Sequence, residues 1–163
     1  MVLKRSKIIV LFLVIVFFIS CDEKRVFDEY KGLNGTWEKD SIIRFTFNQN
    51  DTIHPYNLFL NIRNNNDYPF SNLFLTVTMK QPDSLVKIDT LEYAMANADG
   101  SLMGEGFSDV KESKLWYQEN FVFKQKGEYT IEIQQALRET GSVSGVEELK
   151  GVTDVGFRIE KTK

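Results

Sequence analysis

Near its centre the chain reads Tyr56-Asn57-Leu58-Phe59-Leu60-Asn61-Ile62-Arg63, and shortly after it reads Asn72-Leu73-Phe74-Leu75-Thr76-Val77-Thr78-Met79. In both segments every second side chain is apolar, and most residues are of types that favour strands. This spacing puts one face of a β-strand into a core. Between the two segments lies Asn64-Asn65-Asn66-Asp67-Tyr68-Pro69, whose residue types are those of turns. We therefore expect either a hairpin or two strands of a Greek key.

The same alternation recurs on both sides of this pair. We expect further strands at residues 41–47, 85–93, 114–123, 127–133 and 152–160. Residues 94–113 read as irregular and contain Gly100, Gly104 and Gly106, so this long segment is either functional or contains a short element. Residues 134–149 read as a loop with one helical turn. About seven strands with short connections favour a β-sandwich.

Tyr129 refines this prediction. It stands in Gly127-Glu128-Tyr129-Thr130-Ile131 and resembles the tyrosine corner of immunoglobulin-like sandwiches, with Ile131 in the place of the usual cysteine. The alternative is a tyrosine that merely opens a strand. We expect an all-β, immunoglobulin-like antiparallel β-sandwich over residues 36–163.

The N-terminus has the layout of a secretory signal. A basic stretch over residues 1–7 precedes an apolar block over residues 8–19 and the small residue Ser20. The block is nearer half of the roughly 20 apolar residues that a transmembrane helix needs. We therefore expect residues 1–20 to be a signal peptide that is cleaved.

Cys21 follows that signal and is the single cysteine of the chain. Phe18-Ile19-Ser20-Cys21 resembles the lipobox of bacterial lipoproteins, although Phe18 departs from the commoner Leu. The resemblance implies cleavage before Cys21, diacylglycerol on its thiol and an acylated N-terminus. Cys21 is thus the expected lipid-attachment site, and residues 21–35 are the expected tether.

The charge balance restricts the partners. Without residues 1–20 the chain has 17 Lys and Arg against 23 Asp and Glu, a net charge near −6. This balance argues against a nucleic-acid partner, because no basic stripe is present to neutralise phosphates. It also predicts no electrostatic attraction to anionic lipid. Membrane attachment then depends on acyl chains, which contribute roughly 0.8 kcal/mol for each buried methylene.

Residues suited to catalysis are sparse. His54 is the single histidine, so a Ser-His-Asp or Cys-His site would need it. A zinc site with two or more His or Cys ligands is excluded once Cys21 carries lipid. Pairs of acids of the kind that glycosidases use are available, but none stands out. We therefore expect no catalytic residue, no metal, no cofactor and no small-molecule substrate.

Two groups of surface residues are candidates for function. The first is a partner-binding loop in the turn between the central strands, formed by Arg63, Tyr68, Pro69 and Phe70; alternatively, its aromatic rings fold back over the end of the sandwich. The second is the triplet of Asp, Ser or Thr, and an apolar residue. It occurs four times, and its hydroxyl residues are Ser41, Thr52, Ser84 and Thr90. The triplet resembles the O-glycosylation motif of Bacteroidota envelope proteins, but Asp, Ser and Thr are also common at turns.

Several segments together resemble the GldH gliding-motility lipoproteins of Bacteroidota. They are the lipobox Cys21, residues 63–73, Asp89-Thr90, Gly127-Glu128-Tyr129, residues 135–138 and residues 154–160. The resemblance implies a lipid-anchored protein of the outer membrane, needed for gliding and linked to the type IX secretion and motility apparatus. It implies action through contacts with envelope proteins, on either the periplasmic or the cell-surface face, and no catalytic residue.

Two other functional classes remain open from the sequence. A carbohydrate-binding lipoprotein would need a flat platform of exposed aromatic rings, for which Trp37, Trp116 and Tyr68 are candidates. An enzyme would need a pocket with convergent polar groups around His54 or an acid pair.

Overall fold

The computed structural model describes residues 23–106, 108–138, 141 and 144–162. The expected signal peptide and Cys21 lie outside these residues. Within them, every regular element is a β-strand, and no helix is long and apolar enough to cross a membrane. The strands are β1 (Arg25–Gly32), β2 (Thr36–Glu38), β3 (Ile43–Gln49), β4 (Tyr56–Asn64), β5 (Asn72–Lys80), β6 (Val86–Ala94), β7 (Lys111–Phe121), β8 (Gly127–Gln135), β9 (Glu148–Lys150) and β10 (Val152–Lys161).

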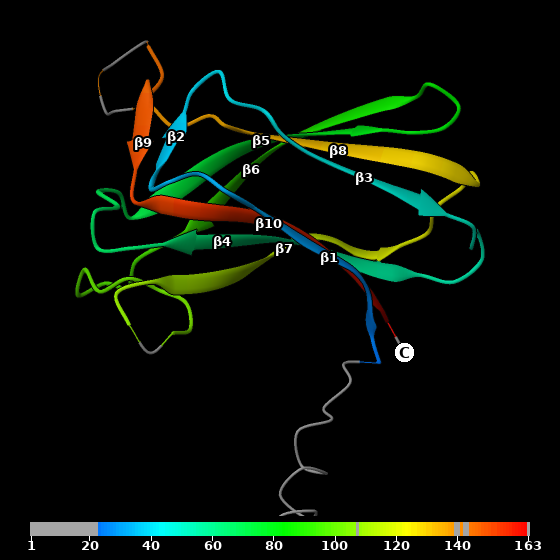
Figure 1. The fold of residues 1–163 in the computed structure, drawn as a ribbon, viewed down its shortest axis with the longest axis horizontal. Coiled ribbons are helices and arrows are strands. Elements are labelled where there is room, and N and C mark those ends of the chain that lie inside the picture. Colours follow the sequence, from blue (N-terminus) through cyan, green and yellow to red (C-terminus); the bar gives the residue numbers. More distant parts are fainter. Residues whose placement is uncertain (1–22, 107, 139–140, 142–143, 163) are drawn as a thin grey trace, which may run out of the picture.

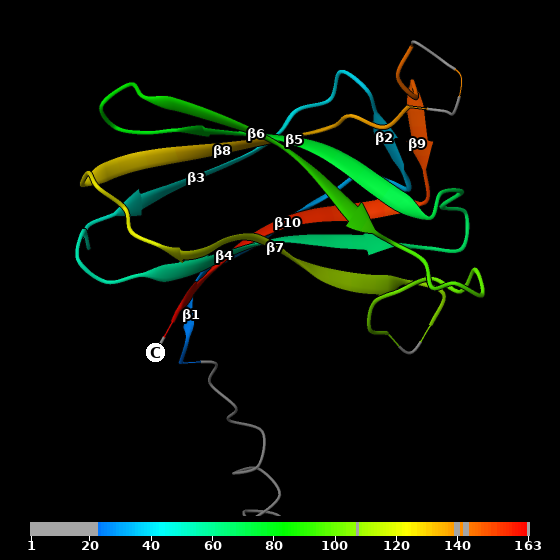
Figure 2. The same ribbon diagram turned by 180° about the vertical axis from the view of Figure 1, so that it is seen from behind.

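The strands form two layers. The first sheet has the order β1-β10-β4-β7 and the second has the order β3-β8-β5-β6, and all pairs are antiparallel. Figure 1 shows the second sheet above the first, with the short ribbon of β2 and β9 at one end. Figure 2 shows the opposite side, where the edge strands β6 and β7 lie in front. The prediction of an all-β sandwich is confirmed.

The core lies between the sheets and follows the alternation in the sequence. Leu58, Leu60 and Ile62 of β4 are fully buried, as are Leu75 and Val77 of β5. These two strands belong to different sheets, so the hairpin is wrong and the Greek-key alternative remains. The physical reason is that β4 pairs on its two sides with β10 and β7, which leaves no edge for β5.

The tyrosine corner is present. Tyr129 is fully buried, and its hydroxyl donates a hydrogen bond to the carbonyl oxygen of Gln125 at 3.0 Å. The backbone N–H of Gln125 donates to the same hydroxyl at 3.2 Å. The ring stacks on Phe47 of β3, with centroids 5.8 Å apart. This contact joins the start of β8 to the core, as expected for a sandwich corner.

Three expectations need correction or completion. Residues 25–32 were expected in the tether, but they form β1 and pair with β10. The sequence did not reveal this edge strand because neither of its faces is fully buried, so its residues show no clear alternation. The helical turn expected within residues 134–149 is absent from its described part, where β8 ends and β9 pairs with β2. The irregular segment 94–113 contains the expected short elements, namely isolated bridges between Ala96 and Leu102 and between Glu105 and Glu112.

The described chain begins beside its own C-terminus. The backbone N–H of Lys161 donates to the carbonyl oxygen of Lys24 at 2.8 Å. In Figure 1 this start lies below the first sheet, on the side away from the second sheet. The described chain therefore starts on the side of the outer face of the first sheet.

Candidate functional site

The outer face of the first sheet carries ordered rows of polar and aromatic side chains. The strand register aligns Asp28, Arg158, Phe59 and Trp116 in one row, and Tyr30, Gly156, Asn61 and Lys114 in the next. A third row contains Asp154, Arg63 and Glu112. Facing side chains on neighbouring strands lie about 5 Å apart, so each row can form direct contacts. We call this surface the outer face below.

Tyr30 is at the centre of one cluster on this face. Its ring lies over Gly156, where an added Cβ would come within 2.8 Å of the ring carbons. Its hydroxyl donates to Glu112 Oε1 at 2.9 Å and accepts from Asn61 Nδ2 at 2.8 Å. Arg63 Nε donates to Glu112 Oε2 at 2.7 Å, and its guanidinium carbon lies 4.2 Å from the centroid of the Tyr30 ring. These four side chains hold one another in a fixed arrangement.

This cluster predicts a measurable pH dependence. Burial, followed by the hydrogen bond to Glu112, raises the pKa of Tyr30 from 10.0 to about 12. Because the folded-state pKa lies above the unfolded value, the resulting stability is fully present below pH 10 and is lost as the pH rises towards 12. We expect Glu112→Gln to lower the pKa of Tyr30, measured by a ¹³Cζ titration in NMR. Glu160→Gln, on the same face, should leave that pKa unchanged; equal pKa values in wild type and E112Q would contradict the assignment.

Trp116 lies in the next part of the same face. It is 52% exposed, whereas its cross-strand neighbour Phe59 is 4% exposed although both project outwards. The two ring centroids are 4.5 Å apart, and Lys114 Nζ lies 4.0 Å from the centroid of the Phe59 ring. Trp116 and Lys114 together cover Phe59. A large indole surface thus remains available to a partner on a rigid support.

A chain of ion pairs continues from Lys114 across the sheet. Lys114 Nζ lies 2.7 Å from Glu160 Oε1, Glu160 also pairs with Arg158, and Arg158 Nη1 lies 2.9 Å from Asp28 Oδ2. Burial alone would raise the pKa of Glu160, but its bonds to Lys114 and Arg158 outweigh burial and lower the pKa. These charges are paired before any partner binds, so the face presents an ordered rather than a mobile surface.

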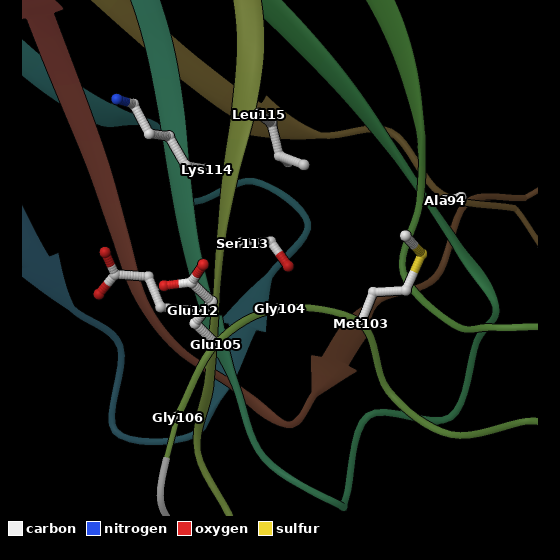
Figure 3. Close-up of a pocket in the computed structure, with 9 residues that line it drawn as sticks. All are labelled: Ala94, Met103, Gly104, Glu105, Gly106, Glu112, Ser113, Lys114 and Leu115. Carbon is white, nitrogen blue, oxygen red and sulfur yellow. The ribbon is translucent and has the colours of Figure 1, made fainter.

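An open pocket of about 760 Å³ adjoins the outer face at β7 (Figure 3). It is lined by Ala94, Met103, Gly104, Glu105, Gly106, Glu112, Ser113, Lys114 and Leu115. Among the described residues, no group of three or more His, Cys, Asp or Glu side chains could hold a metal ion.

The candidate loop residues do not form one surface. Tyr68 is only 5% exposed, and its hydroxyl donates to the carbonyl oxygen of Asn72 at 2.7 Å. The prediction that Tyr68 is an exposed aromatic residue is therefore wrong, because its ring packs into the end of the core. Phe70 is half-buried and packs edge-on against Tyr68, Pro69 is exposed, and Arg63 lies on the outer face beside Tyr30.

The aromatic platform required for carbohydrate binding does not form. Trp37 is fully buried, with Nε1 donating to the carbonyl oxygen of Ser41 at 2.9 Å, and Tyr68 is buried as well. Of the three candidate rings Trp116 alone is exposed. A single indole beside charged residues is not a flat multi-ring platform.

His54 and the hydroxyl candidates are at the surface to different degrees. Exposed His54 Nδ1 lies 2.7 Å from Asp51 Oδ2, and Asp51 also accepts hydrogen bonds from the backbone N–H groups of Ile53 and His54. These bonds hold the pKa of Asp51 well below its usual range and fasten a turn. The candidate hydroxyls divide into exposed Ser84 and Thr90 and half-buried Ser41 and Thr52.

Sequence reasoning missed Tyr30 and Glu112. They are 82 residues apart, and only the pairing of β1 with β10, β10 with β4 and β4 with β7 brings them together. Polar residues at alternate positions of β4 and β7 indicate that one face of these strands is exposed to solvent. This pattern does not show which side chains of other strands they contact.

Comparison with known proteins identifies the family. A family model described as GldH lipoprotein matches residues 25–159. The chain belongs to the GldH lipoprotein family. It is 54% identical over 159 residues to the gliding motility lipoprotein GldH of Flavobacterium johnsoniae, covering 98% of each chain. It is also 54% identical over 148 residues to a gliding motility lipoprotein GldH homolog of Christiangramia forsetii, covering 91% of each.

Solved structures resemble the domain only distantly. The VP2 subviral particle of infectious bursal disease virus gives a TM-score of 0.43 at 14% identity, over 86% of this chain and 33% of that chain. The GH115 4-O-methyl-alpha-glucuronidase BtGH115A gives a TM-score of 0.45 at 11% identity, over 88% of this chain and 18% of that chain.

The family match and the two relatives confirm the predicted resemblance to GldH lipoproteins. This GldH-family chain belongs to a membrane-anchored lipoprotein family named for motility rather than for an enzyme.

Proposed function

We propose that this chain is an outer-membrane lipoprotein that supports gliding motility and the associated type IX secretion machinery. In this proposal it is a non-catalytic module that contacts envelope proteins, and it is held to the membrane by lipid on Cys21. The observation that carries the proposal is the 54% identity, over 98% of both chains, to a relative named for gliding motility.

The outer face is the proposed contact surface. Trp116 offers a large exposed ring on a rigid support, and tryptophan and arginine are over-represented among residues that dominate protein interfaces. Arg63 is held in place by Glu112 and Tyr30, so little side-chain entropy is lost when a partner docks. The ion pairs around Lys114 form a polar rim beside the indole.

A complementation experiment tests this function. The chain would be expressed in Flavobacterium johnsoniae that lacks its own 54% identical relative. We expect the wild-type chain to restore colony spreading, and the double variant Trp116→Ala and Arg63→Ala to reduce spreading at least 10-fold at equal protein abundance. Ile88→Ala is the matched control, because Ile88 is exposed on the second sheet. Full spreading with the double variant, or none with the wild type, would refute the proposal.

We also propose that Ser84 and Thr90 carry O-linked glycans. Both hydroxyls follow Asp and precede an apolar residue, and both residues are exposed, at the β5–β6 turn and on β6. Half-buried Ser41 and Thr52 are less accessible to a transferase. Intact-mass measurement of the protein made in Flavobacterium johnsoniae should give a mass above that of lipid plus polypeptide, and Ser84→Ala with Thr90→Ala should remove most of the excess. A wild-type mass equal to lipid plus polypeptide would exclude glycans.

A further inference from the structure

The residues that the structure describes cover only part of the edge of β7. The short segment Gly104–Gly106 pairs with it through two hydrogen bonds, from Glu105 N–H to the Glu112 carbonyl oxygen and from Glu112 N–H to the Glu105 carbonyl oxygen, both 2.8 Å. Along an antiparallel strand the backbone N–H and C=O of every second residue point to the same edge. Lys114, two residues after Glu112, therefore directs its N–H and C=O to the edge that Glu105 occupies at Glu112. This edge thus accepts an antiparallel strand from elsewhere in the chain.

The covering segment leaves β7 before it reaches Lys114. The backbone N–H of Met103 donates to the carbonyl oxygen of Met95 at 2.8 Å, which turns the chain away from β7. Two residues beyond Lys114, the hydroxyl of Tyr93 donates to the carbonyl oxygen of Trp116 at 2.6 Å. The open pocket lies between these two points. Figure 3 shows Met103 and Ala94 across from the residues of β7 that line the pocket.

The pocket wall holds a polar group without a partner. Ser113 is 6% exposed, and its hydroxyl has no hydrogen-bond partner among the described residues. Gly104 lies directly against this hydroxyl, because an added Cβ there would be 2.9 Å from Ser113 Oγ and 2.6 Å from the Glu112 carbonyl oxygen. A buried polar atom without a partner destabilises the free protein, so a donor or acceptor placed there by a ligand is favoured.

The lining of the pocket carries an excess of acid. It contains two acids, Glu105 and Glu112, and one base, Lys114, whose ammonium is paired with Glu160. Glu112 is paired with Arg63, whereas Glu105 is exposed at the rim of the pocket. This excess of negative charge favours a cationic segment over an acidic one.

We propose that the open edge of β7 at Lys114 binds a basic, extended segment of a partner protein, which adds as an antiparallel strand and places one side chain in the pocket. Lys114 supplies one backbone donor and one acceptor, Met103 and Leu115 line the apolar wall, and Glu105 faces the cationic side chains. Strand addition of this kind obtains affinity from backbone bonds and specificity from pockets. The inference rests on the proposed function as a protein-contact module and names the mode of contact and the charge of the segment.

A peptide titration tests the inference on the ¹⁵N-labelled full-length protein in non-ionic detergent. The probe is a nine-residue peptide that alternates Lys and Thr. We expect saturable shifts at the amides of Ala94, Met103 and Lys114, and affinity at least 10-fold lower for a Glu–Thr peptide and for a backbone-N-methylated Lys–Thr peptide. Absence of shifts, shifts confined to other regions, or equal affinities for the three peptides would overturn the proposal.

Variants make the test specific. Lys114→Pro removes the outward N–H, and Lys114 faces Asn61 in a pair that makes no bonds across the β4–β7 ladder, so the sheet should persist. We expect K114P to lose peptide binding and Lys114→Thr to keep it. If the K114P spectrum shows disruption of the sheet, Glu105→Lys replaces it and should bind at least 10-fold more weakly, with Glu128→Lys on β8 as the unaffected control. Unchanged binding in the variant used would overturn the proposal.

The two proposals can fail separately. If the wild-type chain restores spreading but the peptide does not bind at β7, the edge site is wrong and the motility function stands. If the peptide binds as expected but the wild-type chain restores no spreading, the edge site stands and the motility function is wrong.

Discussion

Gly151→Ala should destabilise the folded protein by about 2–5 kcal/mol. Gly151 has φ of 82°, and a left-handed conformation costs an alanine roughly 1–2 kcal/mol. An added Cβ would also lie 2.2 Å from the backbone nitrogen of Tyr68 and 2.5 Å from its Cα. Backbone atoms cannot rotate away as a side chain can, so overpacking adds about 1–3 kcal/mol. Gly151 also links two turns through its backbone. Its N–H donates a hydrogen bond to the carbonyl oxygen of Gly35, and its own carbonyl oxygen accepts one from the N–H of Asn65.

Urea unfolding followed by circular dichroism measures this effect. Gly35→Ala is the matched control, because Gly35 has φ of 83° and no atom within 4 Å of an added Cβ. It should lose only the conformational part, about 1–2 kcal/mol. Equal losses for the two variants would show that the close approach of Gly151 to Tyr68 has no energetic weight.

Cys21→Ala should abolish lipid attachment. The lipobox proposal makes the Cys21 thiol the acceptor of diacylglycerol, and alanine offers no nucleophile at that position. In Flavobacterium johnsoniae grown with a clickable palmitate analogue, we expect label in the wild-type chain and only background in the variant. The variant should also keep residues 1–20 and migrate more slowly on a gel.

Asp22→Ala provides the control for this second prediction, because it alters the adjacent residue and keeps the thiol. It should incorporate label at the wild-type level. Undiminished label in Cys21→Ala would place the lipid on another residue and remove the basis for the anchor.

Alternation revealed the strands with one buried face, and also β6, whose side chains alternate between exposed and half-buried. β3, β5 and β8 each alternate between buried and less buried side chains along their whole length, so sequence and structure agree there. β1 has no fully buried residue, and β2 and β9 have three residues each, so their sequences contain too little periodicity to predict a strand. β4 departs in another way, because Phe59 and Asn61 on its outer side are buried by side chains from β1 and β7.

The candidate site was predictable only in fragments. The sequence offered Arg63 as part of a partner-binding loop with Tyr68, and Trp116 as part of a carbohydrate-binding platform, but it did not place the two residues on one surface. Their arrangement depends on the register of four strands from distant parts of the chain, and a shift of one residue in any pair would turn the face inside out. Gly156 illustrates the difficulty, since its role is to make room for a ring more than 100 residues earlier in the chain.

Site-specific photo-crosslinking tests the central claim most directly, namely that the anchored sandwich acts through its outer face. A photoreactive phenylalanine would replace Trp116 in one strain, and Thr78 on the second sheet in another, in Flavobacterium johnsoniae that depends on this chain for spreading. We predict a discrete higher-mass adduct with an envelope protein from position 116 and none from position 78. Adducts from position 78 alone, or from neither position in cells that spread normally, would contradict the account.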